Sequence, residues 1–162
     1  MELVPFAPAY AAVVASWPRS AAEAMMWCGQ REFPVPARIV ADWQRDEEVS
    51  AYLLMAGDAL IGYGEVWLDA QDKEAELARI IIAPEARGNG RGRALVRFLL
   101  SEAVKAGYPG IFMRVHPDND PALRCYRGAG FVVVEASLAQ AWNAGQPVSY
   151  VWLRHGGAGP GH

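Results

Sequence analysis

Hydrophobic and polar positions repeat with two different periods along this chain, and the period changes near residue 49. Before that point, apolar residues recur at helical spacing between prolines and glycines. Ser20 and Glu23 have the spacing of a capping box, Gly29 is placed to end that helix, and Pro36 is placed to begin the next. The pattern predicts a short strand over Leu3–Phe6 and helices over Ala9–Trp17, Ser20–Cys28 and Pro36–Arg45.

After residue 49 the period becomes that of strands. Three runs joined by short turns indicate antiparallel neighbours, whereas a full helix before the fourth run indicates a parallel pair with a right-handed crossover. The predicted strands are Tyr52–Met55, Ile61–Leu68, Glu74–Ile82, Ile111–Val115, Phe131–Glu135 and Val148–Leu153, and the predicted helices are Gly90–Ala106 and Pro121–Arg127. We expect one α/β domain over residues 1–155 and a disordered tail over residues 156–162.

The composition is that of an ordinary globular protein: 162 residues, 52% hydrophobic and 20% charged. This length is enough to bury a core without disulfides or structural metal. Cys28 and Cys125 lack metal-ligand spacing, so no metal site is predicted. The chain starts without a secretory signal, and its apolar runs fall short of the roughly 18–20 residues that a membrane helix needs. We therefore expect a cytoplasmic protein that does not enter a membrane.

One dense basic cluster stands out against a net charge of −3. It consists of Arg87, Arg91, Arg93 and Arg97. Nucleic acid binding normally needs a broad basic face, whereas this cluster is local. The charge pattern predicts a phosphate site and no binding of nucleic acid.

The cluster surrounds a glycine loop, RGNGRG at residues 87–92, that joins the apolar run Leu77–Ile82 to a helix. At such a junction, free backbone N–H groups and the helix dipole both favour an anion. The loop therefore predicts a phosphorylated cofactor, and a Cβ at Gly90 or Gly92 is expected to push the phosphate away. The G-x-G-x-x-G spacing of dinucleotide-binding oxidoreductases is absent, and the loop follows several strands, which argues against that class.

A second pattern, N-x-x-A-x-x-x-Y-x-x-x-G-F, follows about thirty residues later. It is formed by Asn119, Ala122, Tyr126, Gly130 and Phe131. Together with the R/Q-x-x-G-x-G/A block that begins at residue 87, it resembles the GNAT superfamily of acyl-CoA-dependent N-acyltransferases. The resemblance covers residues 60–135.

This resemblance implies a GNAT-type fold, which is a central mixed, mostly antiparallel sheet flanked by helices, with a parallel pair splayed around the cofactor. It implies direct transfer of an acetyl group from acetyl-CoA to a primary amine, either a small molecule or a peptide N-terminus. A homodimer is compatible with it. The residues that it assigns to coenzyme A are Ile80, Ile81, Ile82, Arg87, Gly88, Asn89, Gly90, Arg91, Gly92, Arg93, Asn119 and Tyr126.

The reaction needs a base, because the acceptor amine must lose a proton before it attacks, and an acid for the departing thiolate. The resemblance favours Glu76 as the base, eleven positions before Arg87, with Glu65 as the alternative. By strand alternation, Glu76 is expected on the same face as Ile80 and Ile82. Tyr126 matches the acid of the family. Cys125 next to it is expected to be packing, not an acyl-enzyme nucleophile.

The acceptor pocket carries no sequence motif. The resemblance places the acceptor pocket among the first two helices and the late strands, and the candidate contacts are Trp17, Glu23, Trp27, Glu65 and Trp142. The alternative function is a non-catalytic acyl-CoA-binding or regulatory domain of the same fold. The identity of the amine and the length of the acyl chain stay open.

Overall fold

The computed structural model describes residues 1–155, so the tail over residues 156–162 lies outside the described residues. One sheet runs through the molecule, and its only parallel pair among the described strands is β4 with β5. In spatial order the strands are β1 (Glu2–Pro5), β2 (Val49–Ala56), β3 (Ala59–Asp69), β4 (Glu74–Ile82), β5 (Gly110–Val115), β7 (Val151–His155) and β6 (Phe131–Val133). The predicted mixed, mostly antiparallel sheet is confirmed.

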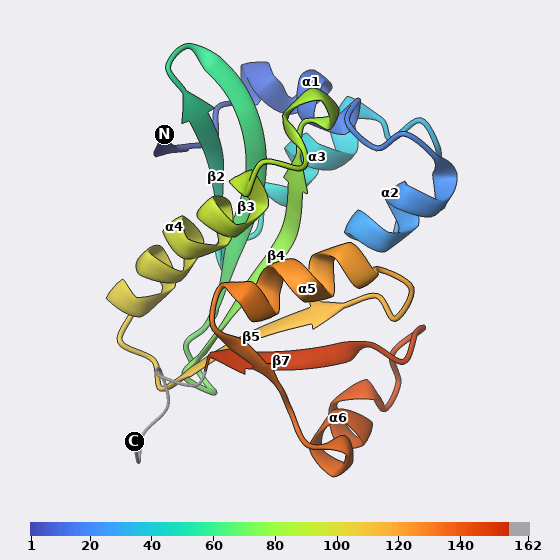
Figure 1. The fold of residues 1–162 in the computed structure, drawn as a ribbon, viewed down its shortest axis with the longest axis vertical. Helices are drawn as coiled ribbons and strands as arrows, with labels where there is room; N and C mark the ends of the chain where they lie inside the picture. Colours follow the sequence, from blue (N-terminus) through green and yellow to red (C-terminus); the bar gives the residue numbers. More distant parts are fainter. Residues whose placement is uncertain (156–162) are drawn as a thin grey trace.

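Helices cover both faces of this sheet (Figure 1). They are α1 (Ala11–Ala15), α2 (Ala21–Cys28), α3 (Ala37–Trp43), α4 (Arg91–Lys105), α5 (Asp120–Gly128) and α6 (Ala136–Asn143), with 3-10 turns η1 (Pro8–Tyr10) and η2 (Pro84–Ala86). In Figure 1, α4 crosses in front of the central strands and α5 lies in front of β5. None of the described helices is long and apolar enough to cross a membrane.

The N-terminal helices follow the local signals closely. Ser20 accepts from the Glu23 N–H at 3.1 Å, and Gly29 ends α2 in the left-handed conformation with φ 71°. The Glu23 carboxylate reaches back to the Arg19 N–H at 3.2 Å, one residue earlier than a capping box requires. Pro36 is the N-cap of α3, with extended backbone, and not its first helical residue.

Three elements differ most from the sequence prediction. The last strand, predicted over Val148–Leu153, is β7 at Val151–His155. The expected helix over Ala9–Trp17 is a 3-10 turn followed by the short helix α1, which ends at Ala15 before Pro18. Helix α6 was missed: no side-chain hydrogen bond caps its N-terminus, although Gly145, left-handed with a φ of 80°, follows its C-cap Ala144. The strand order was also not predicted, since β7 inserts between β5 and β6.

Two glycines of β3 let α4 lie directly on the sheet. A Cβ built on Gly64 would stand 2.6 Å from Leu99 Cδ1, and one built on Gly62 would stand 3.1 Å from Leu95 Cδ2. Leu95 and Leu99 are fully buried. The missing side chains on β3 therefore make the space that the leucines of α4 fill.

The sheet opens between β4 and β5. These strands pair only at their beginnings, where Glu74, Ala75 and Glu76 face residues 110–112. Beyond Glu76 they diverge, and Figure 1 shows β4 running upward while β5 runs to the side. The main chain of β4 from Leu77 to Ile82 keeps β3 on one side and has no β5 partner on the other.

A bulge at Arg79 changes which face the side chains of β4 occupy. Tyr63 pairs with Ile81 but Glu65 pairs with Ala78. The two residues between them on β4, Arg79 and Ile80, are therefore opposite a single residue of β3, Gly64. Arg79 has a φ of 50°, which is left-handed. The alternation therefore reverses at this residue.

The prediction that Glu76 shares a face with Ile80 and Ile82 is wrong for this reason. Glu76 pairs with Trp67 on the face of Glu65, whereas Ile80 and Ile82 contact the Gly64 and Gly62 positions beneath α4. The carboxylate and the isoleucines lie on opposite faces of one strand.

The packing of α4 against β3 gives a first prediction. Gly64→Ala should lower the free energy of unfolding by about 1–3 kcal/mol through overpacking, and Leu99→Ala by about 2–5 kcal/mol through the cavity that it leaves. In the double variant the new methyl group occupies part of that cavity, so the loss should be smaller than the sum of the two. Urea unfolding of the four proteins measures this coupling.

Val104→Ala is the matched control on the same helix, because Val104 is 55% exposed. It should change the free energy of unfolding by less than about 0.5 kcal/mol. Strict additivity of Gly64→Ala and Leu99→Ala would contradict the described contact.

Candidate active site

The glycine loop and the start of α4 form an open cradle of main-chain N–H groups. Gly88 and Gly90 are left-handed, with φ values of 88° and 76°, and apart from the adjacent residues no described residue comes within 4 Å of a Cβ built on either. Within the described residues, no side chain caps the N-terminus of α4. The N–H groups of its first turn therefore stay available, which fits a diphosphate.

Arg87 braces this loop. Its Nε donates to the Ile82 carbonyl at 2.9 Å, and its guanidinium pairs with Glu23 Oε1 of α2 at 2.5 Å. Arg91 makes a longer contact with the Ala86 carbonyl, at 3.4 Å. Arg87 thus joins the end of β4 to α2, and its charge is already balanced by a carboxylate.

Gly92 serves helix packing. A Cβ built there would stand 3.2 Å from Cys125 Sγ of α5, whereas its own φ is ordinary. Nearby, the Arg93 guanidinium lies against Gly128, where a Cβ would stand 2.5 Å from its nitrogen. The close approach of α4 and α5 therefore depends on two glycines, one on each helix.

Helix α5 carries the second motif. Asn119 is its N-cap and accepts from the Ala122 N–H at 3.3 Å. Tyr126 is partly buried, packs against the core, and lies one position after Cys125. Burial, and to a lesser extent the neighbouring Cys125, raises the pKa of the Tyr126 phenol well above its ordinary value. The phenol is therefore protonated across the neutral range.

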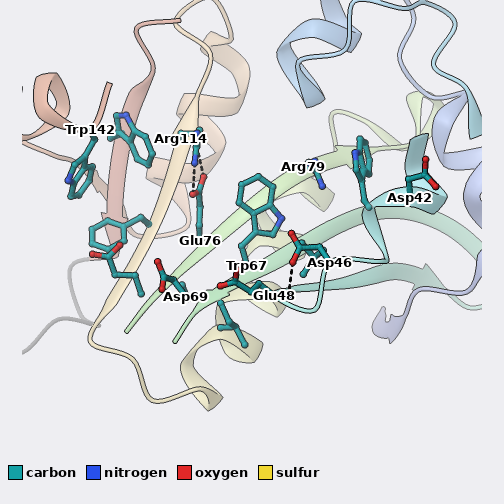
Figure 2. Close-up of a pocket in the computed structure, with 16 residues that line it drawn as sticks. Asp42, Asp46, Glu48, Trp67, Asp69, Glu76, Arg79, Arg114 and Trp142 are labelled. Carbon is teal, nitrogen blue, oxygen red and sulfur yellow. Dashed lines mark hydrogen bonds and ion pairs between the residues drawn. The ribbon is translucent and has the colours of Figure 1, made fainter. Parts of the chain in front are cut away.

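A cavity of about 600 Å³ lies on the opposite face of the sheet, at the point where β4 and β5 still pair (Figure 2). Much of its wall is aromatic, contributed by Trp43, Trp67, Phe112, Trp142 and Trp152. Trp142 packs edge-on against Phe112 and Trp152, with ring centroids 4.9 Å and 5.2 Å away. The cavity is large enough for a small organic ligand.

Carboxylates make up most of the charged wall. They are Asp42, Asp46, Glu48, Asp69, Glu74 and Glu76. Figure 2 shows Asp46, Glu48, Asp69 and Glu76 arranged around Trp67. The pKa of Glu74 is raised, first by burial and then by the negative charges of Asp72, Asp69 and Glu76. These acids therefore repel one another, and a cation would relieve that repulsion.

Both arginines of the cavity wall are already neutralised. Arg114 holds both oxygens of Glu76, with Nε to Oε2 at 2.7 Å and a second guanidinium nitrogen to Oε1 at 2.9 Å. Arg79 donates to Glu65 Oε1 at 2.9 Å, and Glu65 is fully buried. The ion pairs Arg114–Glu76 and Arg79–Glu65 are therefore neutral, and the other carboxylates of the wall leave the cavity negatively charged.

The structure separates the five residues predicted for the acceptor. Trp142 lines the cavity. Glu65 lies buried behind the cavity wall, where Arg79 contacts it. Trp27 donates to the Arg79 carbonyl, Glu23 pairs with Arg87, and Trp17 is buried in the core at 4% exposure. These last three are outside the set of residues that line the cavity.

Several residues of the cavity were missed by sequence reasoning. Trp67, Asp69 and Glu74 could have been found from strand alternation, since they share a face with Glu76 across the β3–β4 hairpin. Arg114 and the acids near the end of α3 carry no motif, and only the fold brings them together. No group of three or more His, Cys, Asp or Glu side chains in the described part of the chain is placed to hold a metal ion.

Comparison with known proteins supports the reading of both motifs. The model of the acetyltransferase (GNAT) family matches residues 13–131. Mycothiol acetyltransferase of Streptomyces bingchenggensis is 31% identical over 87 residues, which are 54% of this chain and 28% of that protein. Mycothiol acetyltransferase of Corynebacterium glutamicum is 29% identical over 129 residues, 76% of this chain and 43% of that protein. The chain spans less than half the length of these relatives.

Solved structures show the same fold. The structure of AAC(6')-Ib with ribostamycin and coenzyme A has a TM-score of 0.74 at 19% identity, covering 94% of this chain and 91% of that chain. Spermidine N-acetyltransferase from Vibrio cholerae, with coenzyme A and spermine, has a TM-score of 0.69 at 18% identity, covering 94% and 92%.

The cysteine beside Tyr126 gives a prediction for this site. Burial raises the pKa of the Cys125 thiol, outweighing the opposing effect of Arg93, and burial also raises the pKa of Cys28. A raised pKa means less thiolate at pH 8, so iodoacetamide should label both cysteines at least about tenfold more slowly in the native protein than in urea. Mass spectrometry of timed samples measures this, and fast labelling of native Cys125 would contradict its role as packing.

Proposed function

The chain belongs to the acetyltransferase (GNAT) family, and we propose that it transfers an acetyl group from acetyl-CoA directly to a primary amine. The observation that carries the proposal is the opening between β4 and β5, which ends at the cradle of N–H groups on α4. A strand edge without a partner can take up an extended ligand as an added strand would, while the cradle takes its diphosphate. Acetyl-CoA has both parts.

The cofactor residues divide by what they contribute. The main chain of β4 at Ile80, Ile81 and Ile82 would hold the pantetheine arm. Residues 88–93 would hold the diphosphate through N–H groups, with Arg91 and Arg93 adding positive charge. Arg87 and Asn119 support these groups, by bracing the loop and by capping α5.

Glu76 is the proposed proton acceptor, and Arg114 determines what it can do. The bidentate pair with Arg114 fixes the orientation of the Glu76 carboxylate in the cavity wall. Each carboxylate oxygen retains a second lone pair, so Glu76 can still accept from a water or from the acceptor ammonium. Because Arg114 engages both oxygens, we propose that a water carries the proton from the amine to Glu76.

Tyr126 is the proposed acid. It lies on α5, whose Cys125 contacts Gly92 at the start of α4. Burial raises the pKa of its phenol, so the phenol carries its proton at neutral pH. A neutral phenol can protonate the thiolate as it leaves, so that free coenzyme A departs as a thiol.

The cavity supports a cationic acceptor. Its aromatic walls and its excess of carboxylates suit an ammonium group, whereas a neutral or anionic acceptor would leave the acids repelling one another. Solved proteins of this fold were crystallised with ribostamycin and with spermine. We propose an amine with more than one positive charge. A cytoplasmic location and a homodimer remain part of the proposal.

The alternative function is a non-catalytic acyl-CoA-binding or regulatory domain. Substitution of Tyr126 distinguishes the enzyme from this alternative. Tyr126→Phe should lower kcat by about 10²-fold, because the general acid is lost, while the Kd for coenzyme A stays the same. Release of free thiol with a panel of amines gives kcat, and calorimetry gives Kd. Calorimetric binding without turnover by the unmodified protein would favour the alternative function.

Gly90→Val is the complementary variant. Valine is strained at a φ of 76°, so the loop should shift and the Kd for coenzyme A should rise by more than about tenfold. Thermal unfolding without cofactor checks that the variant is folded. An unchanged Kd would remove the loop from the proposed site.

The charge of the cavity gives a separate prediction. The pair of substitutions Asp46→Asn and Glu48→Gln should raise KM for a diamine by about threefold to tenfold, since each exposed ion pair is worth about 0.2–1 kcal/mol. The effect should shrink at high salt. KM for acetyl-CoA should not change.

Glu47→Gln is the matched control, because Glu47 lies between these two residues in sequence and is exposed outside the cavity. It should leave KM for the diamine unchanged. An equal effect of Glu47→Gln would mean that overall charge, and not the cavity, attracts the amine.

A further inference from the structure

Arg79 is the one residue of β4 in the left-handed conformation, with a φ of 50°. Residues other than glycine rarely adopt this backbone conformation, and they keep it only where surrounding contacts hold them. It occurs where β4 bulges opposite Gly64, three residues after the last pair with β5. The backbone of β4 therefore turns just where the opening to β5 begins.

Contacts from three elements hold Arg79. Its carbonyl accepts from Trp27 Nε1 of α2 at 2.9 Å, and its guanidinium donates to Glu65 Oε1 of β3 at 2.9 Å. The guanidinium carbon lies 4.1 Å from the ring centroid of Trp43 of α3 and 4.9 Å from that of Trp67. Trp27 thus holds the main chain of Arg79, while Glu65 and the two indole rings hold its side chain.

Glu65 anchors the side-chain contact. It is fully buried and accepts from three donors: Arg79, Trp67 Nε1 at 2.7 Å, and the hydroxyl of Tyr63. All three are donors, so they suit an ionised carboxylate. Tyr63 in turn accepts from Gln44 at 3.1 Å, next to α3. The anchor therefore continues into the helical layer behind the sheet.

We propose that Trp27, Glu65 and Arg79, here called the bulge clamp, are positioning residues that keep the main chain of β4 turned toward the opening for the acetyl thioester. This rests on the proposed function. Without the clamp, the isoleucines that follow would favour regular extended backbone. The N–H and C=O groups after Arg79 would then lose their orientation toward the cofactor, although the diphosphate cradle would remain.

Two substitutions at one position test the clamp. Arg79→Ala removes the side-chain contacts and leaves a residue that is strained at this φ, whereas Arg79→Gly removes the same contacts and adopts it freely. We expect Arg79→Ala to lower kcat by about tenfold or more and Arg79→Gly to recover most of that loss. The Kd for coenzyme A, which lacks the acetyl group, should stay within about twofold in both.

Trp27→Phe is the second test, because it removes the indole N–H but keeps a ring beside Trp43 and Tyr63. A net hydrogen bond of ordinary strength predicts a drop in kcat of about fivefold. Val14→Ala is the matched control: Val14 is fully buried in α1 and outside the site, so the substitution lowers the melting temperature and should leave kcat unchanged.

The amide chemical shifts of Ile80 and Ile81 in NMR spectra depend on the backbone conformation at the bulge, and they can be measured without enzymatic activity. They should move in Arg79→Ala and return in Arg79→Gly, so this readout survives even if the proposed acetyl transfer is wrong. Equal losses of kcat in the two variants, or unchanged amide shifts in Arg79→Ala, would overturn the clamp. Failure of the unmodified protein to bind acetyl-CoA would instead overturn the proposed function.

Discussion

The departure of β4 from β5 after Glu76 is the constraint on which the site depends. Backbone N–H and C=O groups inside a folded protein must find partners, and a central strand normally finds them on both sides. Here β3 pairs with one side of β4 before and after the bulge, while β5 pairs with the other side only at Glu74 to Glu76. The rest of that edge is left for an extended ligand or for water, and the glycine loop lies at its far end.

Because of the bulge at Arg79, side chains before and after it point to different faces of the sheet. Before it, Glu76 faces a cavity lined by carboxylates and indole rings; after it, Ile80 and Ile82 pack beneath α4. A left-handed residue costs roughly 1–2 kcal/mol, and burying Glu65 adds a desolvation cost that its three donors must offset. Such costs concentrate where geometry serves a ligand more than it serves stability.

Local signals were enough to predict much of the architecture. The capping residues of α2, the bounds of β4 and the parallel pair follow from patterns within short windows. The faces of β4 could not be predicted, because nothing in the run from Glu74 to Ile82 marks Arg79 as left-handed. That conformation is imposed by Trp27 and Glu65, which lie 52 and 14 positions away. Likewise, Glu76 pairs with Arg114, which lies 38 positions away, so no sequence motif could predict this ion pair.

Hydrogen–deuterium exchange with and without acetyl-CoA tests the central claim most directly, since it reads the unpaired edge of β4 itself. If the edge takes up the pantetheine arm, the exposed amides between Leu77 and Ile82 and those of residues 90–93 should exchange more slowly once acetyl-CoA is added. Protection confined to residues 90–93, with the β4 amides unchanged, would contradict the account.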